Sequence, residues 1–150
     1  TGYVEWVLGD VRSKSSMHVI TEIDLNSGAM FARNSYNTEF AERTAFFDVD
    51  DTLRTVTGDR TEFLGRNGRL SAPAAMTRTR LSGRVGAALD PCAAIQAPFD
   101  LSEGEERQIV FTLGMGQDAT DAGALVSRFQ GPAAARDAAR RRDDAHAPRS

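Results

Sequence analysis

The polar loop at residues 61–69 carries the side chains best suited to recognise a partner. Glycines flank its tip, an aromatic–aliphatic pair anchors it, and its polar residues include Glu62, Arg66, Asn67 and Arg69. Guanidinium, amide and carboxylate groups form paired hydrogen bonds with sugar hydroxyls, and a guanidinium also pairs with carboxylates of a partner. We therefore predict that Glu62, Arg66 and Asn67 contact carbohydrate or a protein interface. The alternative is an ordinary surface loop held by local hydrogen bonds.

A second candidate is the segment 46–53, in which Asp48 and Asp50 follow two phenylalanines. It resembles the aspartate-nucleophile motif of haloacid-dehalogenase-type phosphatases, where the first Asp attacks phosphorus and the second acts as acid and base. That chemistry also requires a downstream basic residue, further carboxylates for magnesium and a parallel sheet. Here the only lysine, Lys14, lies upstream and no helix is expected after the motif. A β-turn capped by Asp side chains explains the same residues, so we predict no catalytic residue here.

Other residues that could do chemistry have simpler explanations. Ser15, Ser16 and His18 are close in sequence, but we expect His18 to pack or cap rather than to complete a catalytic triad. Tyr3 and Trp6 could stack on a pyranose ring, although their β-prone run favours packing in the core.

Composition excludes several functional classes. The chain has 150 residues, a net charge of −3, two histidines and a single cysteine, Cys92. One cysteine excludes a disulfide framework and a cysteine-rich zinc site, and we expect neither a metal nor a cofactor. The acidic balance argues against general nucleic-acid binding. No run approaches the ~20 apolar residues of a membrane span, and the N-terminus lacks the basic region of a secretory signal.

The first 116 residues are typical of an all-β domain. Short β-prone runs alternate with turn signals about every ten residues, which predicts an antiparallel sandwich or barrel rather than a parallel sheet. The clearest hairpin signal ends at Gly28. A helical turn is expected at 71–76, capped by Ser71, and Gly114-Met115-Gly116 is expected to end a strand. The predicted strands are 3–8, 19–24, 29–33, 44–49, 54–57, 61–64, 93–99 and 106–113.

After residue 116 the sequence changes from short β-prone runs to a helical pattern. Asp118 or Thr120 can cap a helix with an apolar face, and Gly131-Pro132 should end it. Residues 133–150 are rich in Ala, Arg and Asp and have almost no large apolar side chain. We expect a frayed or disordered tail there.

Four motifs that are separated along the chain resemble, in their residues and in their order, the N-terminal β-domain of glycoside hydrolase family 94, in the version carried by cyclic β-1,2-glucan synthases. The resemblance covers roughly residues 3–130. Its motifs are Tyr3-Val4-Glu5-Trp6-Val7-Leu8-Gly9, Ala32-Arg33-Asn34 with Tyr36-Asn37-Thr38-Glu39-Phe40, Val56 to Gly68, and Leu89-Asp90-Pro91-Cys92-Ala93-Ala94-Ile95-Gln96.

The resemblance implies a super-sandwich of two large antiparallel sheets, similar to galactose-mutarotase-like folds, at 1–116. A linker helix at 117–132 and the tail at 133–150 would follow. Family members phosphorolyse β-glucosides with inversion, using a carboxylate of a downstream (α/α)6 barrel. This chain is then expected to lack the barrel and to be non-catalytic. Because it reads as entered partway along a strand, we also expect it to hold part of the super-sandwich, as a fragment.

Three hypotheses follow. The favoured one is a carbohydrate-binding and scaffolding module whose partners are β-1,2-glucan or a related glucoside and the barrel of its parent. That parent is expected to be a homodimer associated with the inner membrane, with this domain on the cytoplasmic side. The second is a purely structural domain that supports the barrel and the dimer and touches no sugar. The third is a phosphatase that uses Asp48 and Asp50. An aromatic-lined concave face beside the loop 62–69 would favour the first, and buried aromatics the second.

Overall fold

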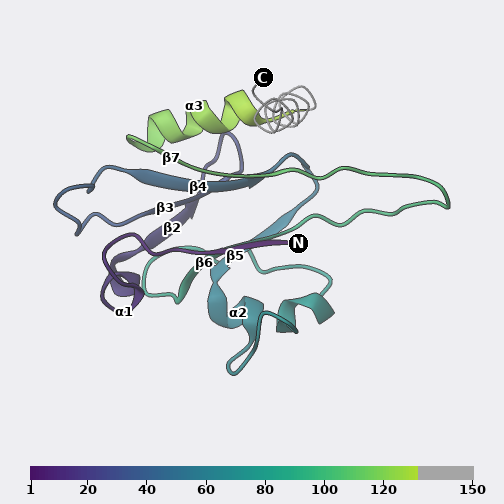
Figure 1. Cartoon of the computed structure of the whole chain (residues 1–150), viewed down its shortest axis with the longest axis horizontal. Helices are drawn as coiled ribbons and strands as arrows, with labels where there is room; N and C mark the ends of the chain where they lie inside the picture. Colours follow the sequence, from purple (N-terminus) through teal and green to yellow (C-terminus); the bar gives the residue numbers. More distant parts are fainter. Residues whose placement is uncertain (132–150) are drawn as a thin grey trace, which may run out of the picture.

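Two antiparallel β-sheets, stacked on a shared core, form the body of the protein (Figure 1). The computed structural model describes residues 1–131. The smaller sheet has the strand order β1-β6-β5 and the larger sheet β2-β3-β4-β7. The strands are β1 (Gly2–Glu5), β2 (Ile20–Ile23), β3 (Met30–Arg33), β4 (Thr44–Val49), β5 (Thr55–Asp59), β6 (Pro91–Gln96) and β7 (Phe111–Gly116). The predicted antiparallel sandwich is confirmed.

Helical segments cover the outer faces of both sheets (Figure 1). Helix α3 (Ala119–Phe129) packs on the larger sheet, where Ala122 and Val126 meet Phe31 and Phe46. Helix α2 (Arg60–Leu64) and the 3₁₀ turn η2 (Ala74–Thr77) cover the smaller sheet around Ala94. Two short elements, α1 (Arg12–Ser15) and η1 (Ser16–His18), lie between β1 and β2. The C-terminal helix predicted from the sequence is therefore present as α3.

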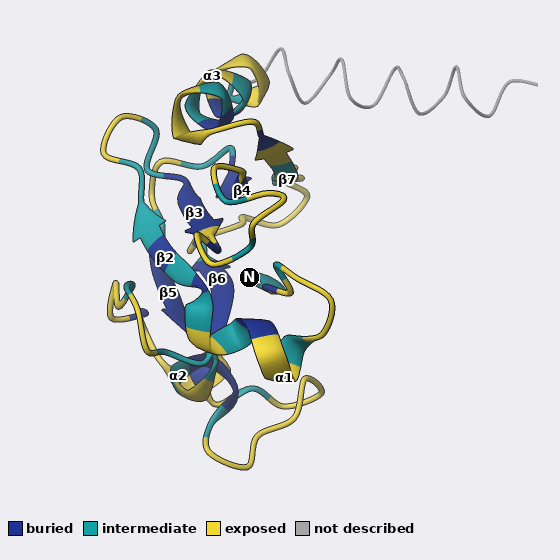
Figure 2. Ribbon diagram, turned by 90° about the vertical axis from the view of Figure 1, so that its left-hand side faces the viewer, coloured by how far each residue is buried: buried dark blue, intermediate teal, exposed yellow. Residues whose placement is uncertain are grey.

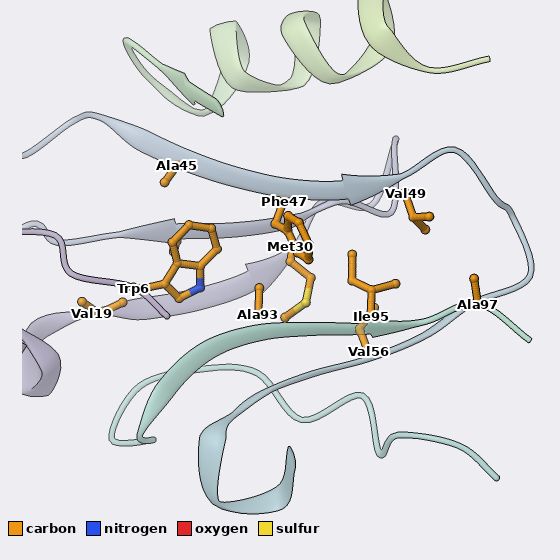
Figure 3. Close-up of a cluster of buried hydrophobic side chains, with 11 residues drawn as sticks. Trp6, Val19, Met30, Ala45, Phe47, Val49, Val56, Ala93, Ile95 and Ala97 are labelled. Atoms are coloured by element: carbon orange, nitrogen blue, oxygen red, sulfur yellow. The ribbon is translucent and has the colours of Figure 1, made fainter. Parts of the chain in front are cut away.

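The central core lies between the two sheets (Figure 3). Side chains alternate between the faces of a strand, so every second residue of β4 and β6 points into this core. The residues between them point outward and are also buried, because the helical segments cover them. Figure 2 shows buried residues concentrated in β3, β4, β5 and β6. The largest members of the core are Trp6, Met30, Phe47 and Ile95.

The hairpin between β2 and β3 forms where the sequence predicts it. Gly28 has a φ of 72°, a left-handed conformation that glycine adopts without steric cost. The Asp24 carboxylate accepts hydrogen bonds from the Ser27 backbone N–H and hydroxyl, at 2.9 and 2.6 Å. This turn sets the register, which pairs Ile23 with Met30. The other strands predicted before residue 60, and the one at 93–99, are present with ends shifted by a few residues.

The strand predicted at 61–64 is wrong, because these residues form helix α2. The Asp59 side chain caps the helix by accepting a hydrogen bond from Thr61 N at 3.0 Å. A helical turn also places two consecutive apolar residues, Phe63 and Leu64, in one buried cluster against the smaller sheet. In a strand they would point to opposite faces.

The strand predicted at 106–113 is displaced toward the C-terminus. Its observed range is Phe111–Gly116, paired with β4 from Val49 back to Thr44. Residues 106–110 lie beyond the end of β4, so they have no strand to pair with. Leu113 lies opposite Phe47, on the face that points toward the other sheet, but it is 60% exposed because β7 is the edge of its sheet.

The helical segments start close to their predicted positions. Asp118 caps α3 by accepting a hydrogen bond from Asp121 N at 2.8 Å, and the helix ends two residues before Gly131. The turn expected at 71–76 is η2, but Pro73 rather than Ser71 precedes it. The predicted tail at 133–150 lies outside the described residues.

Candidate functional site

The Glu62 carboxylate points into the fold. Its oxygens accept hydrogen bonds from Thr57 Oγ1 at 2.6 Å and from the N and Oγ of Ser82 at 2.9 and 2.6 Å. Arg78 Nη1 lies 3.4 Å away on the solvent side, and the Glu62 side chain is only 9% exposed. Glu62 therefore ties helix α2 to strand β5 and to the segment around Ser82.

The environment of Glu62 keeps it ionised. Burial raises the pKa of the carboxyl, but the hydrogen bonds from Ser82 and Thr57 outweigh burial, so the pKa of Glu62 is lowered from its ordinary value. A carboxylate whose oxygens already accept three short hydrogen bonds is held as a structural group. From the sequence we expected the Glu62 side chain to be exposed on the loop. In the structure it points inward, toward Thr57 and Ser82.

Arg66 and Asn67 are exposed at the tip of the loop. Helix α2 ends at Leu64, and the chain after it folds back so tightly that Gly68 N donates to Gly65 O at 3.1 Å. A Cβ at Gly68 would overlap Leu64 O at 1.5 Å. The structure thus separates the three predicted site residues, with Glu62 turned inward and the other two outward. Contact of Arg66 and Asn67 with a ligand or partner stays a prediction.

Phe63 beside this loop and Trp6, a candidate sugar platform from the sequence, are both buried and not available to a sugar. Phe63 is 3% exposed and stacks on Tyr3, with ring centroids 4.6 Å apart. Trp6 is 4% exposed and lies in the central core, as Figure 3 shows. From the sequence we expected exposed aromatics beside the loop 62–69 if it binds carbohydrate and buried aromatics if its role is structural. The buried rings therefore favour a structural role for this loop.

The aspartates of the phosphatase-like motif hold the fold together. Asp48 forms a buried ion pair with Arg54 and accepts a hydrogen bond from Gln130 Nε2 at 2.8 Å. Asp50 Oδ1 accepts a hydrogen bond from Val110 N, just before β7, at 3.0 Å. Asp51 Oδ1 accepts a hydrogen bond from Leu53 N at 3.0 Å. The Asp51 side chain caps the bend after β4, as the turn explanation expects, whereas Asp48 lies within β4 itself. The antiparallel sheet lacks the parallel framework that the phosphatase chemistry needs.

The glycine pair in β7 has a packing explanation. A Cβ at Gly114 would lie 2.4 Å from the Phe46 ring, and a Cβ at Gly116 would lie 2.3 Å from the backbone nitrogen of Ala122 in α3. These glycines let the ring and the helix approach the strand. Gly116 ends β7, as predicted.

An ion network joins β1, α1, α2 and the loop before β6. Arg60 Nε donates to Glu5 Oε1 at 2.8 Å, and Arg12 pairs with both Glu5 and Asp90. The hydrogen bond from Arg60 holds the pKa of Glu5 below its ordinary value. Burial raises the pKa of the nearby Cys92 thiol, which makes it a poor nucleophile at neutral pH.

A hollow lined by polar and aromatic residues lies on another part of the surface, beside the connection between β3 and β4. His18 and Tyr36 stack there, with ring centroids 4.3 Å apart and planes at 9°. Asn37 and Phe40 line the hollow, whose volume is about 550 Å³. Sequence reasoning assigned no chemistry to these residues, although three of them belong to the second motif of the resemblance. The sequence does contain one indication of this site, which is the clustering of aromatic and amide residues in that motif.

No group of three or more His, Cys, Asp and Glu side chains converges as a metal site in residues 1–131, the described part of the chain. None of its helices has the length and apolar character needed to cross a bilayer.

Comparison with known proteins matches residues 1–132 to the family model for the supersandwich domain of glycosyl hydrolase 94. The chain is also 39% identical, over 114 residues, to cyclic beta-(1,2)-glucan synthase NdvB of Rhizobium meliloti (strain 1021). That match covers 75% of this chain and 4% of the larger protein. The match over nearly the whole chain agrees with the observed sandwich, and this protein belongs to the supersandwich domain family of glycosyl hydrolase 94.

Proposed function

We propose that this chain is a non-catalytic β-domain of a β-1,2-glucan-processing enzyme, with roles in carbohydrate binding and in scaffolding the catalytic part. The observation that carries the proposal is the 39% identity to a cyclic beta-(1,2)-glucan synthase, within a family of glycosyl hydrolase domains. A homodimeric parent and a position on the cytoplasmic side of the inner membrane belong to the same proposal.

The non-catalytic assignment is supported by how the candidate acids are used. Catalytic carboxylates need an open position from which they can reach a substrate. Asp48, Asp50 and Glu62 instead accept structural hydrogen bonds or form a buried ion pair. The catalytic acid is therefore proposed to lie in the barrel domain of the parent enzyme.

The scaffolding role is supported by the surface formed by α2, η2 and the loop between them. Arg66 and Asn67 project from this surface, and Leu70 and Met76 are 64% and 58% exposed on it. Arginine and methionine are enriched at protein interfaces, where apolar contacts combine with charged hydrogen bonds. We assign Arg66 and Asn67 to contacts with the neighbouring domain or with glucan. Glu62 holds the base of their loop in place.

Isothermal titration calorimetry of the purified chain with linear β-1,2-glucooligosaccharides tests the carbohydrate role, with cellobiose as the control ligand. We expect saturable heat with the β-1,2-linked chains. Loss of this heat in a folded Arg66→Ala/Asn67→Ala double variant would place the sugar on that loop. Heat that persists in the variant would place the sugar elsewhere on the domain.

The alternative is a purely structural domain without sugar contact, and the buried Phe63 beside the loop favours it. No heat from a folded, monodisperse sample would establish this alternative and overturn the carbohydrate role.

A further inference from the structure

The hollow beside the β3–β4 connection is built by three separate parts of the chain. They are the loop after β1, the segment formed by α1 and η1, and residues 34–40. A smaller hollow of about 240 Å³ adjoins it and shares Gly9, Asn34, Asn37 and Phe40 with it. Sites for small ligands are concavities of about 300–1,000 Å³ that combine apolar surface with a few polar groups. The larger hollow, at about 550 Å³, falls in that range.

The wall between the two hollows is held rigidly. Asn34 is 6% exposed, and its Nδ2 donates to Leu8 O at 2.6 Å while its Oδ1 accepts from Tyr36 N at 3.1 Å. Asn37 Oδ1 accepts from the backbone N–H groups of Glu39 and Phe40, at 3.1 and 3.3 Å. Such preorganisation reduces the conformational entropy lost when a ligand binds.

These bonds leave one amide group for a ligand. Both polar atoms of the Asn34 side chain are used within the wall. The half-buried Asn37 uses only its oxygen, and no hydrogen bond within residues 1–131 involves its Nδ2. An amide NH₂ group carries two donors, which suit hydroxyl oxygens.

Two aromatic rings that line the same hollow are exposed. Tyr36 is 78% exposed, and because only one of its faces stacks on His18, the other face is open to solvent. Phe40 is 49% exposed, with Arg43 Cζ 5.2 Å from its ring centroid. The C–H face of a pyranose ring packs on an aromatic face, while its hydroxyls require hydrogen-bond partners such as the amide of Asn37.

The charges around the two hollows balance. Asp10 and Glu39 contribute two negative charges, and Lys14 and Arg43 contribute two positive charges. A site for phosphate or another anion would carry an excess of basic groups, and a site for a cation would carry an excess of acids. The balance favours an uncharged ligand with many hydroxyl groups.

We infer that this hollow binds an uncharged oligosaccharide, with Tyr36 and Phe40 as stacking surfaces and Asn37 as a hydrogen-bond donor. The ligand class follows from the geometry, and the choice of a β-1,2-linked glucan rests on the proposed function. The site is separate from the loop at Arg66, whose neighbouring aromatics are buried.

The test is calorimetry with linear β-1,2-glucooligosaccharides on the wild type and three variants. Tyr36→Ala and Phe40→Ala each remove a stacking surface, and we expect each to weaken binding about tenfold. Phe99→Ala is the matched control, because Phe99 is similarly exposed, at 45%, and also lies under an arginine. The control should bind as the wild type does. Added salt should leave the affinity unchanged, because the ligand is uncharged.

The outcomes separate the two proposals. Binding by the wild type that is unchanged in Tyr36→Ala and Phe40→Ala would overturn this site and leave the proposed function standing. No binding by the wild type would overturn the carbohydrate role and this inference with it. If a variant loses its fold, an NMR titration of the wild type decides: the backbone amide signals of residues 36–40 must shift, and shifts confined to residues 66–68 would overturn this site.

Discussion

Replacing Glu62 by alanine should destabilise the domain without touching its core. The change removes the acceptor for Thr57 Oγ1, a hydroxyl on a residue that is 0% exposed, and for two groups of Ser82. A buried donor left without a partner costs about 1–3 kcal/mol. Ser82 is exposed, so water can replace its bonds at little cost. We therefore expect a loss of about 2 kcal/mol in the free energy of unfolding.

Urea unfolding followed by circular dichroism measures this loss, and thermal unfolding should show a Tm lower by about 4–8 °C. Glu62→Gln keeps an accepting oxygen and should lose about half as much. Glu103→Ala is the matched control, because Glu103 lies exposed in a turn. If Glu62→Ala unfolds at the same urea concentration as Glu103→Ala, Glu62 does not stabilise the fold and our reasoning about the loop is wrong.

Further predictions concern pH, the buried ion pair and the close approach of α3. The pKa values of Glu5 and Glu62 are both lowered by folding, so their stabilisation is complete above the ordinary value of 4.5 and is lost as the pH falls through the lower folded values. Urea midpoints measured from about pH 6 to about pH 3 should fall at the acid end, and less steeply in Glu62→Gln. Arg54→Ala leaves the buried Asp48 carboxylate unpaired, so chemical denaturation should show a loss of about 3–5 kcal/mol; a loss below about 1 kcal/mol would contradict the ion pair. Gly116→Ala places a Cβ 2.3 Å from the backbone of α3, and differential scanning calorimetry should show a destabilisation of about 1–3 kcal/mol; an unchanged Tm would mean that the helix can move away freely.

Local patterns in the sequence predicted most of the strands. The hairpin before β3 is set by a glycine and an aspartate within five residues. The helix caps are also local, as the hydrogen bond from Asp121 N to Asp118 shows. The separated motifs, taken in order, were sufficient to indicate the family that the comparison later showed.

The errors arose where contacts distant in sequence decided the outcome. The apolar pair Phe63-Leu64 is compatible with either a strand or a helix, and packing against Ala94 selected the helix. Strand β7 begins at Phe111 because its partner β4 ends at Val49. Neither fact is encoded in the local pattern of these segments.

For the candidate sites, the sequence by itself determined which functional groups are present. The tertiary structure decided which of them point inward, which are exposed and which lie together. Glu62 is held inward because Ser82, twenty residues away in sequence, provides two donors that a buried carboxylate requires. Tyr36 stacks on His18 because the connection between β3 and β4 folds over the segment before β2. A hydrogen bond or an aromatic stack depends on distances of a few ångströms between segments. Those distances exist only once the two sheets have packed on their shared core.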